Sequence, residues 1–268
     1  MITIAGKAFN STPLMQEYAP SSVEALVLKQ MADSTYSYKY DTLDTLKFEL
    51  KLRAAIVNAA KQLYNSRMRF AIFQNSRCNE QYWNRTSNGG FELKDGVRPS
   101  AAINDIFING PKYATECATA MVIVYYKALL DTFGATAFDR LFPDPYLMNW
   151  RVTDPLLREV GVPVKVADLL LGDRAYFANP DVDPRTPQWQ GENAIVLPNG
   201  LYYGHGIGIE DANTIIRTLN DSRKPGATRT AYLMDSAGRP DFKKLSRLYY
   251  NASAPLVWKP FPPPVFAV

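Results

Sequence analysis

The stretch CATAMVIVYY, from Cys117 to Tyr126, is the feature that most limits how this chain can fold. It holds no charged residue, and it is only half as long as the roughly 20 residues that a helix needs to span a bilayer. We therefore predict a helix that is buried on most sides, in the core of a globular protein. Thr115 is a suitable N-cap for this helix, and Gly134 is a natural stop after Phe133.

A second, amphipathic helix is predicted over residues 41–66, with Asp41 or Thr42 as its cap. Its apolar residues recur at helical spacing: Leu43, Leu46, Leu50, Val57, Ala60 and Tyr64. A β-hairpin is predicted around the segment Pro198-Asn199-Gly200. Because no sequence repeat accompanies these elements, we expect a single α+β domain over residues 1–250. Residues 251–268 form a Pro-rich tail that we expect to be extended and not helical.

Composition excludes several classes of function. The 30 basic and 26 acidic residues give a net charge of +4 without a dense basic run, so no nucleic-acid partner is expected. No signal peptide or membrane-spanning segment is recognisable, which indicates synthesis in the cytoplasm and no membrane partner. The two cysteines, Cys78 and Cys117, and the single histidine, His205, are too few for the usual zinc sites, and a calcium-loop pattern is absent. We therefore expect neither a metal nor a cofactor.

Cys117 is the candidate nucleophile. In the first turn of the predicted helix, the backbone N–H groups and the helix dipole would stabilise a thiolate, lower its pKa and bind an oxyanion. The alternative is a small side chain in the core, which is the commoner role of a cysteine on an apolar helix. Cys78 lies in the polar segment NSRCNE, where we expect an exposed thiol without a function.

Glu192 and His205 are the candidate bases, and the hairpin would bring them together. A loop with an even number of residues places Leu197 opposite Tyr202, so that Glu192 and His205 lie diagonally on one face of the sheet. An odd loop would place them on opposite faces. Either Glu192 takes the thiol proton itself, or His205 does so while Glu192 orients it. With Glu116 nearby, a thiolate and two carboxylates would share a proton. The alternatives are a solvated glutamate at a strand edge and a histidine packed between glycines.

Five segments carry a resemblance to a known family. They are FELKLRAAIVNAAKQL (48–63), NGPKYATECATAMVIVYYKALLDTFG (109–134), QWQGENAIVL (188–197), YGHGIGI (203–209) and RKPGATRTAYL (223–233). Together they resemble the Bacillus spore-type protein-glutamine γ-glutamyltransferases, or transglutaminases. The similarity extends from near the first residue to about residue 250.

The resemblance implies an NlpC/P60-like, papain-related core in which helices surround a central twisted sheet. It implies a calcium-independent acyltransferase that cross-links glutamine to lysine in spore coat proteins, through a thioester and with release of ammonia. In this family the nucleophile position falls on Cys117 and the acid/base position on Glu192, for which Glu116 can partly substitute.

The resemblance also implies a substrate tunnel lined by Phe70, Trp150 and Trp189. His205 matches a histidine of the family's hairpin, and we count it among the substrate-binding candidates. We expect a monomer that is synthesised in the cytoplasm and located on the spore coat. Its partners would be coat proteins that carry accessible Gln and Lys side chains.

Two other functions fit the same residues. A papain-like cysteine hydrolase, either a peptidase or a cell-wall amidase, would use Cys117 with His205 and transfer the acyl group to water. A non-catalytic protein of a spore or particle shell would use the apolar helix and the Pro-rich tail only for packing.

Overall fold

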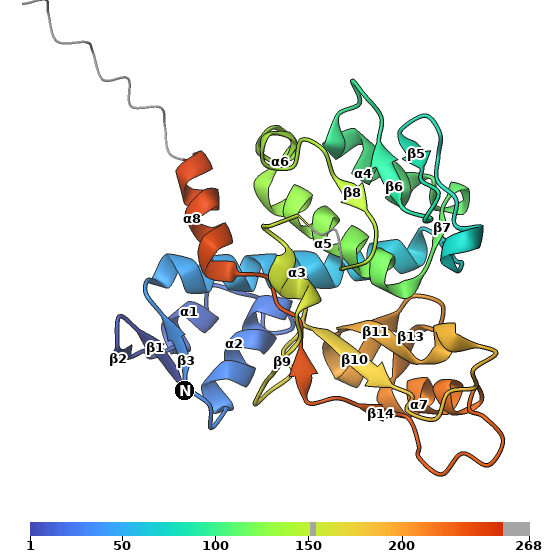
Figure 1. Cartoon of the computed structure of the whole chain (residues 1–268). Helices are drawn as coiled ribbons and strands as arrows, with labels where there is room; N and C mark the ends of the chain where they lie inside the picture. Colours follow the sequence, from blue (N-terminus) through green and yellow to red (C-terminus); the bar gives the residue numbers. More distant parts are fainter. Residues whose placement is uncertain (151–153, 254–268) are drawn as a thin grey trace, which may run out of the picture.

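The structure is a computed structural model, and it describes residues 1–150 and 154–253 (Figure 1). The helices are α1 (Thr12–Met15), α2 (Val23–Asp33), α3 (Leu43–Asn65), α4 (Pro99–Ile108), α5 (Cys117–Phe133), α6 (Ala135–Leu141), α7 (Ala212–Asn220) and α8 (Phe242–Ser253). The strands are β1 (Ile2–Ile4), β2 (Lys7–Ala8), β3 (Tyr38–Tyr40), β4 (Arg69–Phe70), β5 (Trp83–Arg85), β6 (Phe91–Leu93), β7 (Ala114–Thr115), β8 (Tyr146–Leu147), β9 (Val164–Lys165), β10 (Arg174–Ala178), β11 (Gly191–Val196), β12 (Leu201–Gly204), β13 (Gly208–Asp211), β14 (Tyr232–Leu233) and β15 (Ser236–Ala237).

Helices α3 and α5 pack against each other at the centre of the molecule (Figure 1). Every residue of α5 from Ala118 to Tyr126 is buried, which confirms the prediction of a helix that is apolar on most sides. Helix α3 begins after Thr42, whose hydroxyl accepts the backbone N–H of Thr45, so one of its two predicted caps is confirmed. Among the residues that the structure describes, no helix is long and apolar enough to cross a bilayer.

The start of α5 lies one residue later than predicted. Glu116 is the N-cap, and Thr115 belongs to β7, which pairs in parallel with β4. The prediction of a Thr115 cap was wrong because the carboxylate of Glu116 accepts the backbone N–H groups of Ala118 and Thr119 in the first turn. The other end agrees with the sequence, since Gly134 follows Phe133 with a φ of +78° that glycine adopts without strain.

The largest sheet is antiparallel and has the strand order β13-β12-β11-β10-β14. Neighbouring side chains of β11 point to opposite faces: Ile195 joins the core around α3 and α5, whereas Ala194 packs with residues of α7. The sheet therefore has helices on both faces, but it lies beside the α3–α5 pair, which itself occupies the centre (Figure 1). Smaller sheets flank this arrangement, in the orders β2-β1-β3 and β5-β6-β8.

Helix α8 closes the described part of the chain against α3, where the rings of Phe48 and Tyr249 lie 5.3 Å apart. It continues to Ser253, so the expectation that the chain leaves helical structure at Asn251 was wrong. The physical reason is that Asn251, Ala252 and Ser253 precede the first proline of the tail and simply extend the helix before them. The rest of the predicted tail lies outside the described residues.

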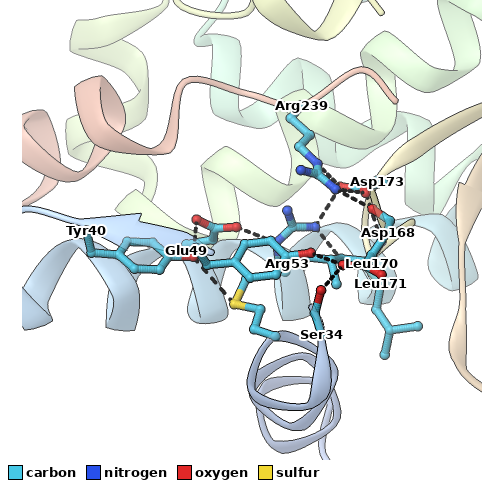
Figure 2. A network of polar contacts seen from close by, with 11 residues as sticks. Ser34, Tyr40, Glu49, Arg53, Asp168, Leu170, Leu171, Asp173 and Arg239 are labelled. Atoms are coloured by element: carbon cyan, nitrogen blue, oxygen red, sulfur yellow. Dashed lines mark hydrogen bonds and ion pairs between the residues drawn. The ribbon is translucent and has the colours of Figure 1, made fainter. Parts of the chain in front are cut away.

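A buried polar network joins α3 to the start of β10 (Figure 2). The guanidinium of Arg53 donates to Glu49 and to Asp173, each at 2.8 Å, and Arg239 donates to both oxygens of Asp173 at 2.8 and 2.7 Å. Burial alone would raise the pKa of Asp173, but the two guanidinium groups hold it below its usual value. Because Asp173 directly precedes Arg174, the network fixes the strand that forms one wall of the site described next.

Candidate active site

Cys117 is half-buried and lies in the wall of a cavity of about 880 Å³. It is the first residue of α5, a helix held in place by the core behind it. The cavity lies between this helix start, β4, β10 and β11, and its walls include Phe70, Glu116, Trp150, Arg174, Tyr176 and Asn193. A thiol in this position can meet a substrate and remain fixed by a rigid element.

The carboxylate of Glu116 is anchored at the start of α5. Its oxygens accept the backbone N–H of Ala118 at 2.5 Å, that of Thr119 at 2.7 Å, and the Thr119 hydroxyl at 2.5 Å. A negative charge is favourable at this end of a helix because the helix dipole is positive there. Two of the N–H groups that the sequence offered for an oxyanion are therefore already bound to Glu116.

The cysteine and the buried glutamate share one electrostatic environment. Burial raises the pKa of the Cys117 thiol, and the negative charges of Glu192 and Glu116 raise it further. Burial also raises the pKa of Glu192 well above its ordinary value, and the charge of Glu116 adds to this. The backbone N–H of His205 partly offsets this rise in the pKa of Glu192.

The prediction that the helix start lowers the pKa of Cys117 was wrong, because burial and two acidic neighbours outweigh the dipole. Glu192 is only 2% exposed, and its Oε1 has no hydrogen-bond partner within residues 1–150 and 154–253. Burial and the neighbouring negative charges therefore favour the protonated forms of both Cys117 and Glu192.

The hairpin that carries Glu192 and His205 has an odd loop. Val196 pairs with Tyr202 and Ala194 pairs with Gly204, and the loop between the strands is Pro198–Gly200. The predicted even register was wrong because Asn199 adopts a φ of +63°, which closes a three-residue turn. Glu192 and His205 therefore lie on opposite faces of the sheet. The predicted Glu–His pair would have required them on the same face.

His205 is a buried histidine whose two ring nitrogens are both occupied. Nδ1 lies 3.0 Å from the hydroxyl of Tyr203, and Nε2 lies 3.1 Å from the carbonyl oxygen of Arg69. A carbonyl only accepts, so Nε2 carries the proton and Nδ1 accepts from the tyrosine. Burial lowers the pKa of His205 to about 4, which keeps the ring neutral at physiological pH. The ring thus ties β4 to the end of β12.

The three predicted aromatic residues lie at or behind the cavity wall. Phe70 and Trp150 line the cavity directly. The ring of Trp189 stacks on that of Phe70, with centroids 6.1 Å apart and planes inclined by 21°. Phe70 also packs over Gly206, where a Cβ atom would lie 2.9 Å from the phenyl ring. Neither Trp189 nor His205 belongs to the cavity lining within the described part of the chain.

The sequence analysis missed two residues that contact this site. Nδ2 of Asn193 lies 3.5 Å from the Cys117 sulfur, and Nη1 of Arg174 donates to Oδ1 of Asn193 at 2.8 Å. Asn193 follows Glu192 in the motif QWQGEN, and neighbouring side chains of a strand point to opposite faces. A hairpin with an odd loop would have placed Asn193, and not Glu192, on the same face as His205, and this was the signal that could have found it. No local signal marks Arg174, which reaches Asn193 only through the pairing of β10 with β11. Across the described ranges, no cluster of three or more His, Cys, Asp or Glu residues could hold a metal ion.

A comparison with known protein families identifies the family of this chain. A family model described as protein-glutamine gamma-glutamyltransferase matches residues 1–249. The chain belongs to this transglutaminase family. It is therefore an acyltransferase.

Individual transglutaminases agree with this assignment. A protein-glutamine gamma-glutamyltransferase of Bacillus cereus is 42% identical over 255 residues, which cover 94% of this chain and 90% of the relative. One from Bacillus anthracis is 43% identical over 253 residues, covering 93% of this chain and 89% of the relative. A solved transglutaminase from Geobacillus stearothermophilus, in a form without its C-terminal extension, is 51% identical with a TM-score of 0.74. The match covers 78% of this chain and 98% of that structure.

Proposed function

We propose that this chain joins protein glutamine to protein lysine through a thioester on Cys117, with Glu192 as the acid/base group and Glu116 as a partial substitute. The observation that carries the proposal is the Cys117–Glu192 pair, in which burial raises the pKa of both groups. A glutamate with a raised pKa binds a proton more strongly than an ordinary carboxylate does, so it is a better acceptor for the thiol proton. Proteins with accessible Gln and Lys side chains are the substrates, and no calcium is required.

Acylation begins when the Glu192 carboxylate takes the proton of the Cys117 thiol. The sulfur attacks the carboxamide carbon of the glutamine, and the carbonyl oxygen becomes an oxyanion that the backbone N–H of Cys117 can bind. Glu192 then gives its proton to the leaving nitrogen, the C–N bond breaks, and ammonia departs. The product is a thioester between the former glutamine and Cys117.

Deacylation reverses the roles of the same groups. The lysine amine attacks the thioester carbon while Glu192 removes its proton, and the C–S bond breaks as the isopeptide bond forms. Glu192 returns the proton to the sulfur, which restores the resting pair. The two half-reactions predict ping-pong kinetics.

The aromatic residues would hold the substrates and exclude water. Phe70 and Trp150 in the cavity wall can pack against the alkyl parts of Gln and Lys, and Trp189 supports Phe70 from behind. Excluding water matters because hydrolysis of the thioester would convert the glutamine to glutamate. We assign His205 to this wall as a support for Phe70, since the two rings lie 6.2 Å apart.

The proposal extends to the fold family and the cellular setting. A helix that begins with the nucleophile and packs on an antiparallel sheet supports an NlpC/P60-like, papain-related core. We propose cytoplasmic synthesis and a location on the spore coat, with coat proteins as substrates, which is consistent with relatives that come from Bacillus. We propose a monomer, to be checked by sedimentation, whose catalytic domain ends near residue 250 and is followed by a Pro-rich tail.

The test is the incorporation of a labelled amine into a glutamine-bearing protein. Cys117→Ala should abolish it, and retained incorporation would end the proposal. Glu192→Gln should lower the rate more than Glu116→Gln, whereas His205→Ala should leave the chemical step in place. Loss confined to the histidine variant would favour the papain-like Cys–His hydrolase instead. Mass analysis of a Gln peptide separates the two, because a hydrolase cleaves the backbone or releases the acid and a transferase leaves an amine adduct.

A further inference from the structure

We propose that Asn193 is a further catalytic residue, which donates from its side-chain amide to the Cys117 sulfur and then to the oxyanion, and that Arg174 is the positioning residue that fixes this amide. The inference rests on the proposed thioester chemistry at Cys117. It goes beyond that chemistry by naming where the second oxyanion donor comes from.

The orientation of the Asn193 amide follows from its partners. Nη1 of Arg174 donates to one end of the amide at 2.8 Å, and a guanidinium has no acceptor atom. The end that faces Arg174 must therefore be the oxygen, and the NH2 group must face the Cys117 sulfur 3.5 Å away. The usual ambiguity between the two ends of an asparagine does not arise here.

Arg174 is itself locked in place. Its Nε donates to the carbonyl oxygen of Val160 at 2.8 Å, and its guanidinium carbon lies 4.7 Å from the centre of the Trp150 ring. Gly238 packs so closely that a Cβ atom there would lie 2.7 Å from Nε and Nη2. Asp173, the preceding residue, is anchored by the network of Figure 2. Arg174 thus presents one fixed donor to Asn193.

A donor from outside the helix is needed at this site. Glu116 already binds the N–H groups of Ala118 and Thr119, so the first turn of α5 cannot offer those two groups to an oxyanion. The oxygen of the intermediate is bonded to the carbon that the sulfur attacks, so a donor facing the sulfur is within reach of it. Arg174 also polarises the amide, which makes its N–H groups stronger donors.

The charge of Arg174 fits the same role. Within residues 1–150 and 154–253 it forms no ion pair, although it is only 3% exposed. A buried guanidinium without a carboxylate is costly, and the developing negative charge at Cys117 compensates it only during the reaction. The hydrogen bonds from Asn193 also act to lower the pKa of the Cys117 thiol, against the effect of its surroundings. An inert role for the pair, filling the space between β10 and β11, would need neither the charge nor the contact with sulfur.

The primary test uses Asn193→Asp and Asn193→Ala. Aspartate keeps the acceptor for Arg174 but removes the donor to sulfur, so the fold is retained while the chemistry is lost. We expect kcat for amine incorporation to fall by about 10²–10³, with KM for the glutamine substrate changed by less than about fivefold. Asn79→Ala is the matched control, because Asn79 is equally buried at 7% exposure and donates to Asp105, away from the cavity.

The readout that separates a catalytic from a structural role is the pH profile of Cys117 alkylation, followed at that residue by peptide mass analysis. Loss of the donor should move the profile to higher pH in Asn193→Ala, and Asn79→Ala should leave it in place even if the melting temperature falls. Arg174→Lys should recover part of the kcat lost in Arg174→Met, because lysine keeps the charge without the fixed fork.

Two results would overturn the inference. One is a kcat within threefold of wild type in both Asn193 variants, and the other is an alkylation profile that stays in place in them. If either result is found and Cys117→Ala is inactive, the catalytic role of Asn193 is rejected while the proposed thioester mechanism is retained. An active Cys117→Ala variant removes the proposed function itself, so the two failures are distinguishable.

Discussion

The hydroxyl of Tyr203 lies 3.0 Å from Nδ1 of His205, and this contact turns the chain's single histidine toward the interior of the protein. With Nε2 bound to the carbonyl of Arg69, neither nitrogen is directed at the Cys117 sulfur. The papain-like alternative needs an imidazole as the partner of the thiol. The structure provides a buried carboxyl group in this environment, and the predictions below depend on that difference.

The first prediction concerns acid stability. An unfolded histidine binds a proton below about pH 6.5, whereas burial lowers the folded pKa of His205 to about 4. The free energy of unfolding should therefore fall by about 3 kcal/mol as the pH drops from about 6.5 to about 4. This contribution is fully present above pH 6.5. Urea unfolding of wild type and His205→Asn at several pH values measures this. The two free energies of unfolding should converge as the pH falls, and a constant difference would contradict the prediction.

The second prediction concerns the acid limb of the kcat profile. In the proposed mechanism Glu192 must be ionised to accept the thiol proton, and its pKa is raised by burial and by the charge of Glu116. Activity should therefore fall at a higher pH than an ordinary glutamate would give. Glu116→Gln removes one of the causes, so it should move the acid limb to lower pH while it lowers helix stability by about 1 kcal/mol.

Thr119→Ala is the control for the second prediction. It removes a hydrogen bond to Glu116 but keeps the carboxylate, so the acid limb should stay near its wild-type position. An acid limb that does not move to lower pH in Glu116→Gln would contradict the prediction.

The third prediction uses the close approach of Gly204 to Glu192. A Cβ atom at residue 204 would lie 2.9 Å from both Cγ and Oε1 of Glu192. Gly204→Ala should therefore displace the carboxyl group and lower kcat by at least tenfold, with a loss of about 1–3 kcal/mol in stability. The shorter side chain of Glu192→Asp should relieve the clash, so the double variant should be as stable as Glu192→Asp alone. Additive losses would mean that the two residues do not meet.

The fourth prediction concerns the network of Figure 2. Arg53→Met leaves Asp173 with one of its two cationic partners in a fully buried position and should destabilise the protein by about 3–5 kcal/mol. Lys29→Met breaks an exposed pair with Asp33 and should cost less than about 1 kcal/mol. Urea unfolding compares the two. Because Asp173 has a lowered pKa, its contribution to stability is lost as the pH falls through that pKa.

The sequence by itself determined the helices that position the site and most of the residues within it. Burial of α5 follows from its uncharged apolar run, and its end at Gly134 follows from the conformational freedom of glycine. These are local properties, which neighbouring residues decide. The residue pattern already offered Glu192 as a base, and the family resemblance added the aromatic residues Phe70 and Trp150, which line the same cavity as Cys117.

Only the tertiary structure decided the rest. The one-residue change in the hairpin loop depends on the backbone of Asn199, and it reverses which face His205 shares. The proton affinities of Cys117 and Glu192 depend on burial, and burial is a property of the packed molecule. The contact from Arg174 through Asn193 to the sulfur joins β10, β11 and α5, and no pattern within one segment encodes a contact among three.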